Sequence, residues 1–281
     1  LNIKEAKLGK DHPDVATTYN NMAVVYKNQG DYSKALEYYQ DALNIREAKL
    51  GKDHPSVATT YNNMALVYEN QGDYSKALEY HQRALNIKEA KLGKDHPYVA
   101  RTYGNMALVY EKQGDSSKAL DYYQEALNIK EAKLGKDHPD VAGTYHNMAV
   151  VYYNQGDYSK ALEYYQDALN IRKAKLGKDH PDVASTYNNM ANVYTKQGDY
   201  SKALVYYQDA LNISEVKLGK DHPGVASTYN NMAMVYYNQG DSSKALDYYQ
   251  EALNIKEAKL GKDHPDVAGT YHNMAVVYYN Q

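Results

Sequence analysis

The chain has 281 residues, with 32 Lys and Arg against 35 Asp and Glu and a net charge of −3. It therefore lacks the basic field that binds a phosphate backbone, and we expect no nucleic-acid partner. The absence of cysteine excludes disulfides and thiolate chemistry and leaves the redox compartment open. No apolar stretch approaches the ~20 residues of a membrane-spanning helix, so we expect no membrane partner and favour a cytoplasmic location.

A 42-residue repeat runs through the whole sequence. Residues 1–42 differ from residues 43–84 at only six positions, and all seven prolines keep the same register. Residues 113–155 are identical to residues 239–281, three repeats later. Repeats of this length stack so that each copy contacts its neighbours. We therefore expect a single repeat array over residues 1–281, which starts with residues 1–9 as the end of a second helix.

The first complete repeat predicts two helices. Asp11 is a suitable N-cap, Pro13 is tolerated in a first turn, and Asp14 places negative charge at the positive end of the helix dipole. We expect this helix to run to about residue 29 and to end at Gly30. Its apolar side chains recur at helical spacing on one face: Val15, Ala16, Tyr19, Met22, Ala23 and Tyr26.

The second helix of the repeat is predicted to begin after the N-cap Asp31 and to end before Gly51. Its expected buried stripe contains Ala35, Leu36, Tyr39, Ala42, Leu43 and either Ala48 or Leu50. Isolated helices of ~15 residues are marginal in water, so the pairs must stack to bury these faces. The pattern recurs along the chain as far as residues 265–281, which read as a first helix.

The repeat resembles the tetratricopeptide family. With Gly30 aligned, the signature positions of that family are occupied by Tyr19, Met22, Ala23, Tyr26, Ala35, Tyr39 and Ala42. The string from Lys49 to Pro55 is similar to the 42-residue repeats of the kinesin light chain branch. The resemblance implies an all-α, right-handed TPR-like α-solenoid, a superhelix of stacked antiparallel helix pairs. It also implies that the first helix of each repeat lines a concave face that binds a protein or an extended peptide.

Exposed positions of the first helices differ most between copies. They include four side chains that we predict to contact a ligand: Arg101, Tyr153, Lys196 and Tyr237. Such variation is expected of a recognition surface, and it is equally expected of solvent-exposed positions that drift after duplication. Acidic and basic residues are mixed along this stripe, so we expect a polar, tyrosine-rich groove, with Leu66, Leu108, Met234 and Tyr98 as apolar contacts.

One asparagine recurs in every copy, at Asn21, Asn63, Asn105, Asn147, Asn189, Asn231 and Asn273. An amide both donates and accepts hydrogen bonds, so a row of amides at repeat spacing suits the main chain of an extended peptide. The family resemblance implies the same role. The alternative is that each amide ties adjacent first helices together.

No constellation of residues indicates chemistry. Each repeat has one histidine in an Asp-His-Pro turn, where we expect a structural role at the helix start, since stacked repeats hold these side chains too far apart to share a metal. His81, His146 and His272 are predicted to make polar or packing contacts. We expect no catalytic residue, no metal and no cofactor. The sequence thus favours a binding scaffold; the alternative is a structural array that associates head to tail through apolar end faces without a dedicated ligand.

Overall fold

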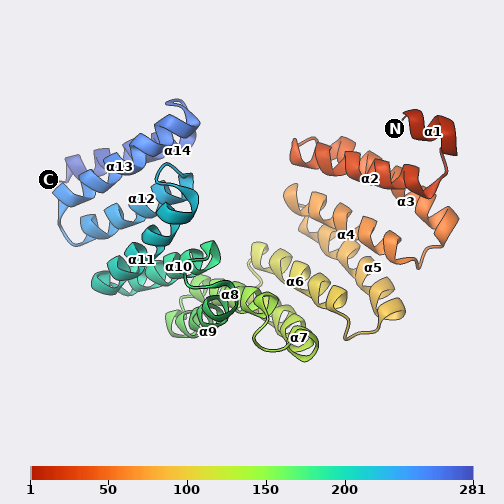
Figure 1. Ribbon diagram of the computed structural model, residues 1–281, viewed down its shortest axis with the longest axis horizontal. Coiled ribbons are helices and arrows are strands. Elements are labelled where there is room, and N and C mark those ends of the chain that lie inside the picture. The colour runs from red at the N-terminus through yellow and green to blue at the C-terminus, as the bar shows by residue number, and fades with distance from the viewer. Residues whose placement is uncertain (1, 281) are drawn as a thin grey trace. The chain divides into compact units, whose positions relative to one another are not determined.

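The computed structural model describes residues 2–280, with side chains from residue 4, and it contains fourteen α-helices and no strands in that range (Figure 1). The helices are Asn2–Leu8 (α1), Pro13–Asn28 (α2), Tyr32–Leu50 (α3), Pro55–Asn70 (α4), Tyr74–Leu92 (α5), Pro97–Lys112 (α6), Ser116–Leu134 (α7), Pro139–Asn154 (α8), Tyr158–Leu176 (α9), Pro181–Gln197 (α10), Tyr200–Leu218 (α11), Pro223–Asn238 (α12), Ser242–Leu260 (α13) and Pro265–Tyr279 (α14).

The chain divides into two compact units, residues 1–136 and 137–281. In the first unit α2 packs on α3, α4 on α5 and α6 on α7; in the second, α8 packs on α9, α10 on α11 and α12 on α13. Each second helix also packs on the first helix that follows it within its unit. These adjacent helix pairs confirm the predicted all-helical, TPR-like α-solenoid.

Each first helix begins one residue later than predicted. His12, and not Asp11, is the N-cap of α2: its backbone is extended and its Nδ1 accepts a hydrogen bond from the backbone N–H of Asp14 at 3.1 Å. Pro13 occupies the next position, where it has no N–H to satisfy, and the imidazole reaches the first free donor beyond it. The predicted structural role of the turn histidines is confirmed, because the equivalent histidine caps every other first helix.

The second helices begin and end as predicted. Asp31 Oδ1 accepts from the backbone N–H of Lys34 at 3.2 Å, and Gly51 ends α3 with a φ of 88°, a conformation that favours glycine. The prediction that Ala48 or Leu50 is buried was wrong, since both are exposed. The last buried side chain of α3 is Arg46, and the final turn lies beyond the packed part of the helix.

Small residues bring the helices close together, and larger ones fill the space between repeats. Ala23 and Ala35 are fully buried where α2 meets α3, and Tyr39 and Met64 lie in the same cluster. Equivalent clusters repeat in both units. The predicted ligand contacts lie on the first helices and are exposed or half-buried.

Candidate functional site

We call the first-helix face the surface of α2, α4 and α6 in the first unit, and of α8, α10, α12 and α14 in the second, that carries the recurring asparagines. In the first unit this face contains a hollow of about 370 Å³ between α4 and α6. The hollow brings together three predicted site residues, which are Asn63, Arg101 and Asn105. Two of the predicted apolar contacts, Leu66 and Tyr98, also line it.

The hollow has a cation that the sequence analysis missed. Lys88 of α5 is only 8 % exposed, and its Nζ donates to Thr102 Oγ1 at 2.7 Å. Burial, and secondarily the positive charge of Arg101, lowers the pKa of Lys88 to about 8. Lys88 lies on a second helix, whereas the sequence analysis considered only first-helix positions.

The same cation position recurs between repeats. Arg46 of α3 donates to the Ser56 carbonyl at 3.0 Å and to Thr60 Oγ1 at 2.7 Å, and Arg172 of α9 makes the corresponding bonds to Asp182 and Thr186. Lys256 donates likewise to Thr270 Oγ1. A second-helix cation thus ties each such pair to the next first helix. Lys or Arg recurs fourteen residues before a recurring threonine. This spacing is the sequence signal that predicts the contact.

The recurring asparagines fall into two groups. Asn63 Nδ2 donates to Asn20 Oδ1 at 3.1 Å, and Asn189 contacts His146 at the same distance, so these two join neighbouring first helices. Asn105 has no side-chain hydrogen bond to the described residues 4–280 and lines the hollow. Structural ties and free amides therefore coexist in the row.

Two histidines are held neutral, His146 on this face and His81 on a second helix. His146 Nδ1 lies 3.1 Å from Arg172, which can only donate, so Nδ1 accepts and Nε2 carries the proton. The Asn189 amide must then present its oxygen to Nε2. Burial, followed by the charge of Arg172, lowers the pKa of His146 to about 4.

His81 takes the place that tyrosine occupies in the other second helices. It is fully buried, its Nδ1 lies 3.0 Å from Asn62 Oδ1, and its Nε2 has no hydrogen-bond partner within residues 4–280. Burial and the nearby Lys88 lower its pKa to about 4. The predicted polar and packing contacts of His81 and His146 are thereby confirmed.

Three of the variable positions predicted to contact a ligand lie on the second unit. Tyr153 is half-buried and its ring packs against Tyr158, with centroids 5.9 Å apart. Lys196 is exposed, and Tyr237 accepts a hydrogen bond from Asn280 Nδ2 at 2.8 Å. The structure places them on α8, α10 and α12.

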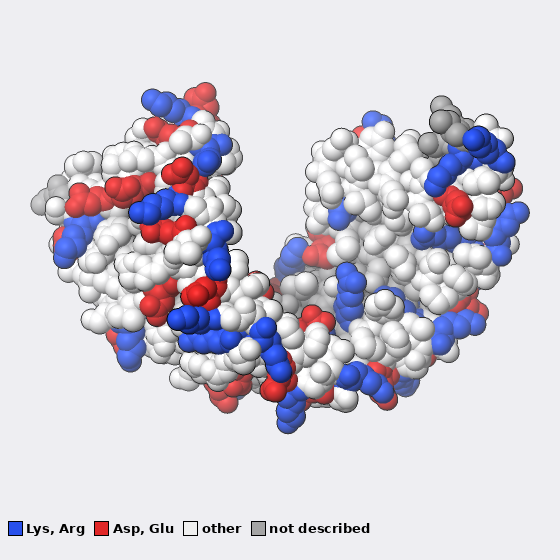
Figure 2. All heavy atoms as spheres, viewed as in Figure 1, with Lys and Arg blue, Asp and Glu red and all other residues white. Residues whose placement is uncertain are grey.

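Charge on the surface is mixed, as predicted. Figure 2 shows Lys and Arg interspersed with Asp and Glu on each unit, with broad uncharged areas between them. On the first-helix face, Lys112 of α6 pairs with Glu69 of α4 at 2.7 Å. The hollow is a local exception, because Lys88 and Arg101 line it without a carboxylate.

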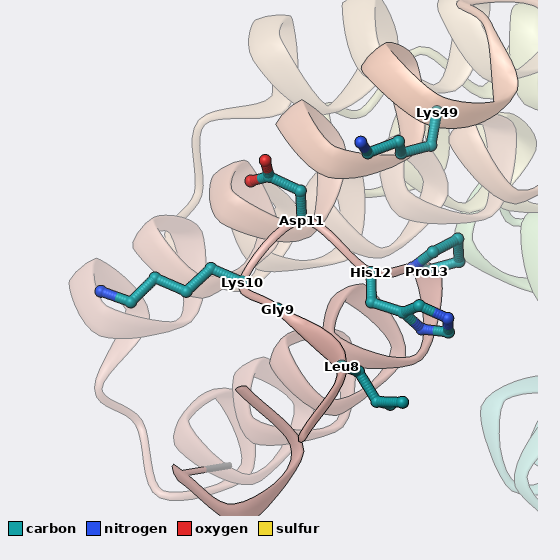
Figure 3. A pocket seen from close by; sticks show the side chains of 7 residues that line it. All are labelled: Leu8, Gly9, Lys10, Asp11, His12, Pro13 and Lys49. Atoms are coloured by element: carbon teal, nitrogen blue, oxygen red, sulfur yellow. The ribbon is translucent and has the colours of Figure 1, made fainter. Parts of the chain in front are cut away.

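Further hollows lie at the loops between repeats. The one at the first loop has a volume of about 430 Å³ and is lined by Leu8 to Pro13 and by Lys49 of α3; Figure 3 shows Lys10 pointing away from Lys49. Equivalent hollows recur at later loops. The described residues contain no cluster of His, Asp and Glu that could hold a metal and no helix long and apolar enough to cross a membrane.

These helix pairs and their register define the class of the protein. The model of the tetratricopeptide repeat matches residues 1–48, 14–90, 56–132, 140–215, 182–258 and 224–281, and the chain belongs to this family. The family is generally a non-catalytic scaffold that mediates protein interactions.

Solved structures share the fold of the chain. BtubC (BKLC) of P. vanneervenii is 26% identical, with a TM-score of 0.68 over 84% of this chain and 92% of that one. A kinesin light chain-like protein of Podosopora anserina with nearly identical TPR-like repeats is 21% identical, with a TM-score of 0.63 over 74% and 98%. The STAND ATPase with a tetratricopeptide repeat sensor from Pyrococcus horikoshii is 21% identical, with a TM-score of 0.73 over 95% and 39%. No curated protein matches the chain.

Proposed function

We propose that the chain is a binding scaffold whose first-helix face is concave and takes an extended peptide of a partner protein. The observation that carries this proposal is the hollow between α4 and α6, which combines a free amide with apolar side chains. Asn105 offers a donor and an acceptor, and Leu66 and Tyr98 offer apolar surface beside it. Small ligand sites generally combine apolar walls with a few placed polar groups.

The arrangement suits a main chain better than a small molecule. The recurring asparagines are 42 residues apart, so successive amides lie on successive first helices within each unit. Peptide bonds offer alternating donors and acceptors along an extended chain, which amides can pair. A shallow, repeated surface of this kind contacts many residues of the peptide weakly and is specific for few of its side chains.

A screen of random extended peptides on the isolated chain, followed by amide chemical-shift mapping of the best binder, tests the proposal. We expect the shifts to concentrate on α4 and α6 and to spare the outward faces of α5 and α7. Shifts confined to the second helices or the loops would contradict it, as would a screen without binders at millimolar peptide.

A second candidate is end-to-end association of copies. It is supported by the apolar side chains on the outer side of α14, where Tyr271 is 50% exposed and Tyr278 61% exposed, whereas the equivalent Tyr229 is half-buried. Burial of such a face against another helix pair is favourable. Sedimentation at hundreds of micromolar separates the candidates: association that Tyr278→Glu abolishes supports stacking, and a monomer at all concentrations contradicts it.

A further inference from the structure

One repeat lacks the cation that ties second helices to the following first helices. Ser214 of α11 stands at the position held by Arg46, Lys88, Arg172 and Lys256 in other repeats. Fourteen residues on, Thr228 of α12 is still present, and its hydroxyl donates to the Gly224 carbonyl at 3.2 Å. The serine side chain is too short to reach from α11 to Thr228. The hydroxyl and carbonyl oxygens that a cation contacts in other repeats therefore have no such donor here.

The missing cation leaves a buried acceptor unsatisfied. In the preceding repeat, Arg172 contacts the side chain of His146 on α8 as well as Thr186 on α10. The residue equivalent to His146 is Asn188 on α10, and its Oδ1 is buried without a hydrogen-bond partner among the described residues. An unpaired buried oxygen is destabilising, and a suitable donor removes that loss.

The same place is also more open than its counterparts. Thr228 is 5% exposed, whereas Thr60, Thr102 and Thr186 are completely buried. Absence of the long side chain removes the cover that Arg46 or Arg172 provides in the other repeats. Thr228 is thus slightly more accessible than these counterparts.

Neutral oxygens are sufficient to hold a cation in this fold. Arg46 is buried, and the hydrogen bonds of its guanidinium go to a backbone carbonyl and a threonine hydroxyl. Gly224 and Thr228 supply the same pair of acceptors, to which Asn188 adds a third. The chemistry of the place matches a guanidinium or an ammonium group.

We propose that Asn188, Thr228 and the Gly224 carbonyl form a subsite for a basic side chain of the bound peptide. An Arg or Lys that crosses α10 and α12 takes the position that Arg172 fills in the preceding repeat and donates to these oxygens. The subsite rests on the proposed peptide binding and adds a specificity to it, namely a preference for a cation at one place.

The test uses peptides selected on the whole chain and synthesised in matched forms with Arg, Lys or citrulline at each basic position. Citrulline keeps the shape of arginine and removes its charge. We expect the Arg form of one position to bind at least tenfold more tightly than its citrulline form. Equal affinities at every position would overturn the subsite while leaving peptide binding intact, and failure of all peptides to bind would instead overturn the proposed function.

Two variants locate the preference. Ser214→Arg supplies the missing cation from within the chain; it is expected to raise the melting temperature and to abolish the difference between Arg and citrulline. Thr228→Val removes one acceptor at constant shape and is expected to reduce the preference severalfold. A preference unchanged in Ser214→Arg, with the fold intact by circular dichroism, would place the cation elsewhere and refute the assignment.

Discussion

The side chains of His146 and Asn189 meet 3.1 Å apart and join α8 to α10. The proton arrangement of this contact is fixed from the other side of the imidazole, where Arg172 donates to Nδ1. His146 is consequently neutral in the folded protein, and its contact with Arg172 requires that neutrality. Such a contact makes the stability of the second unit sensitive to acid.

Lowering the pH from 7 to 5 is expected to destabilise the second unit by about 2 kcal/mol through His146 alone. The folded pKa of about 4 is below the unfolded value of 6.5, so the unfolded state takes up the proton first. Stability is therefore complete above pH 6.5 and falls as the pH drops towards 4. The charge of Arg172 opposes protonation of His146, and the charge of Asp182 favours it. Urea unfolding monitored across this range measures the effect.

The chain itself supplies the control for this prediction. Asparagine occupies the position of His146 in four other repeats, so His146→Asn keeps a polar partner for Arg172 and removes the titration. The same logic applies to the first unit, where His81→Tyr restores the residue of the other repeats. An acid destabilisation that persists undiminished in both variants would show that other groups are responsible.

Arg172→Ser is expected to destabilise the second unit by about 3 kcal/mol. The change leaves Thr186 and the Nδ1 of His146 without a donor, and each unsatisfied buried group costs about 1 to 3 kcal/mol. The denaturation midpoint measures this loss. Serine is the natural residue at the equivalent position of α11, Ser214. A variant as stable as the wild type would mean that these cations contribute nothing to packing.

Gly143→Ala is expected to stabilise α8 by about 1 kcal/mol, because glycine inside a helix is less favourable than alanine by that amount. An added Cβ at Gly143 meets no atom within 4 Å. Gly156→Ala is the matched opposite, since its φ of 80° disfavours a side chain. Differential scanning calorimetry should show shifts of opposite sign. If Gly143→Ala is more stable but binds the peptide less tightly, the glycine is needed to let the peptide backbone approach α8.

Much of the fold was predictable because the same helix-boundary and core residues recur every 42 residues. Proline and glycine mark the helix boundaries in each copy, and Asp31 identifies the second N-cap by its residue type. The first N-cap was misassigned because aspartate is the commoner cap, and only the structure shows that the His12 imidazole reaches the backbone of Asp14.

The site was predictable only in part. The residues Asn63, Arg101 and Asn105 were identified from one helix face, and the structure places them around one hollow. Lys88 was missed because it reaches the hollow from the adjoining second helix. The helix face alone does not distinguish Asn63, which bonds Asn20, from Asn105, which has no side-chain hydrogen bond within residues 4–280. The corresponding neighbour of Asn105 is Asn62, whose side chain contacts His81.

We therefore expect alanine substitutions along the asparagine row to differ in their effect on stability. Asn63→Ala removes the bond to Asn20 and is expected to cost about 1 kcal/mol, whereas Asn105→Ala is expected to cost less than half of that. Thermal melts of the two variants compare them directly. Equal losses would indicate that Asn105 has a structural role after all.

The most direct measurement of the central claim is the affinity of the best library peptide for Asn105→Ala, by calorimetry, beside Asn128→Ala as a control. Asn128 lies on α7, and its Oδ1 accepts a hydrogen bond from Gln124 Nε2 on the exposed helix surface. The account predicts at least tenfold weaker binding to Asn105→Ala, unchanged binding to Asn128→Ala and similar melting temperatures for both. Equal affinities for the two variants would contradict a peptide-binding role for the free amides of the first-helix face.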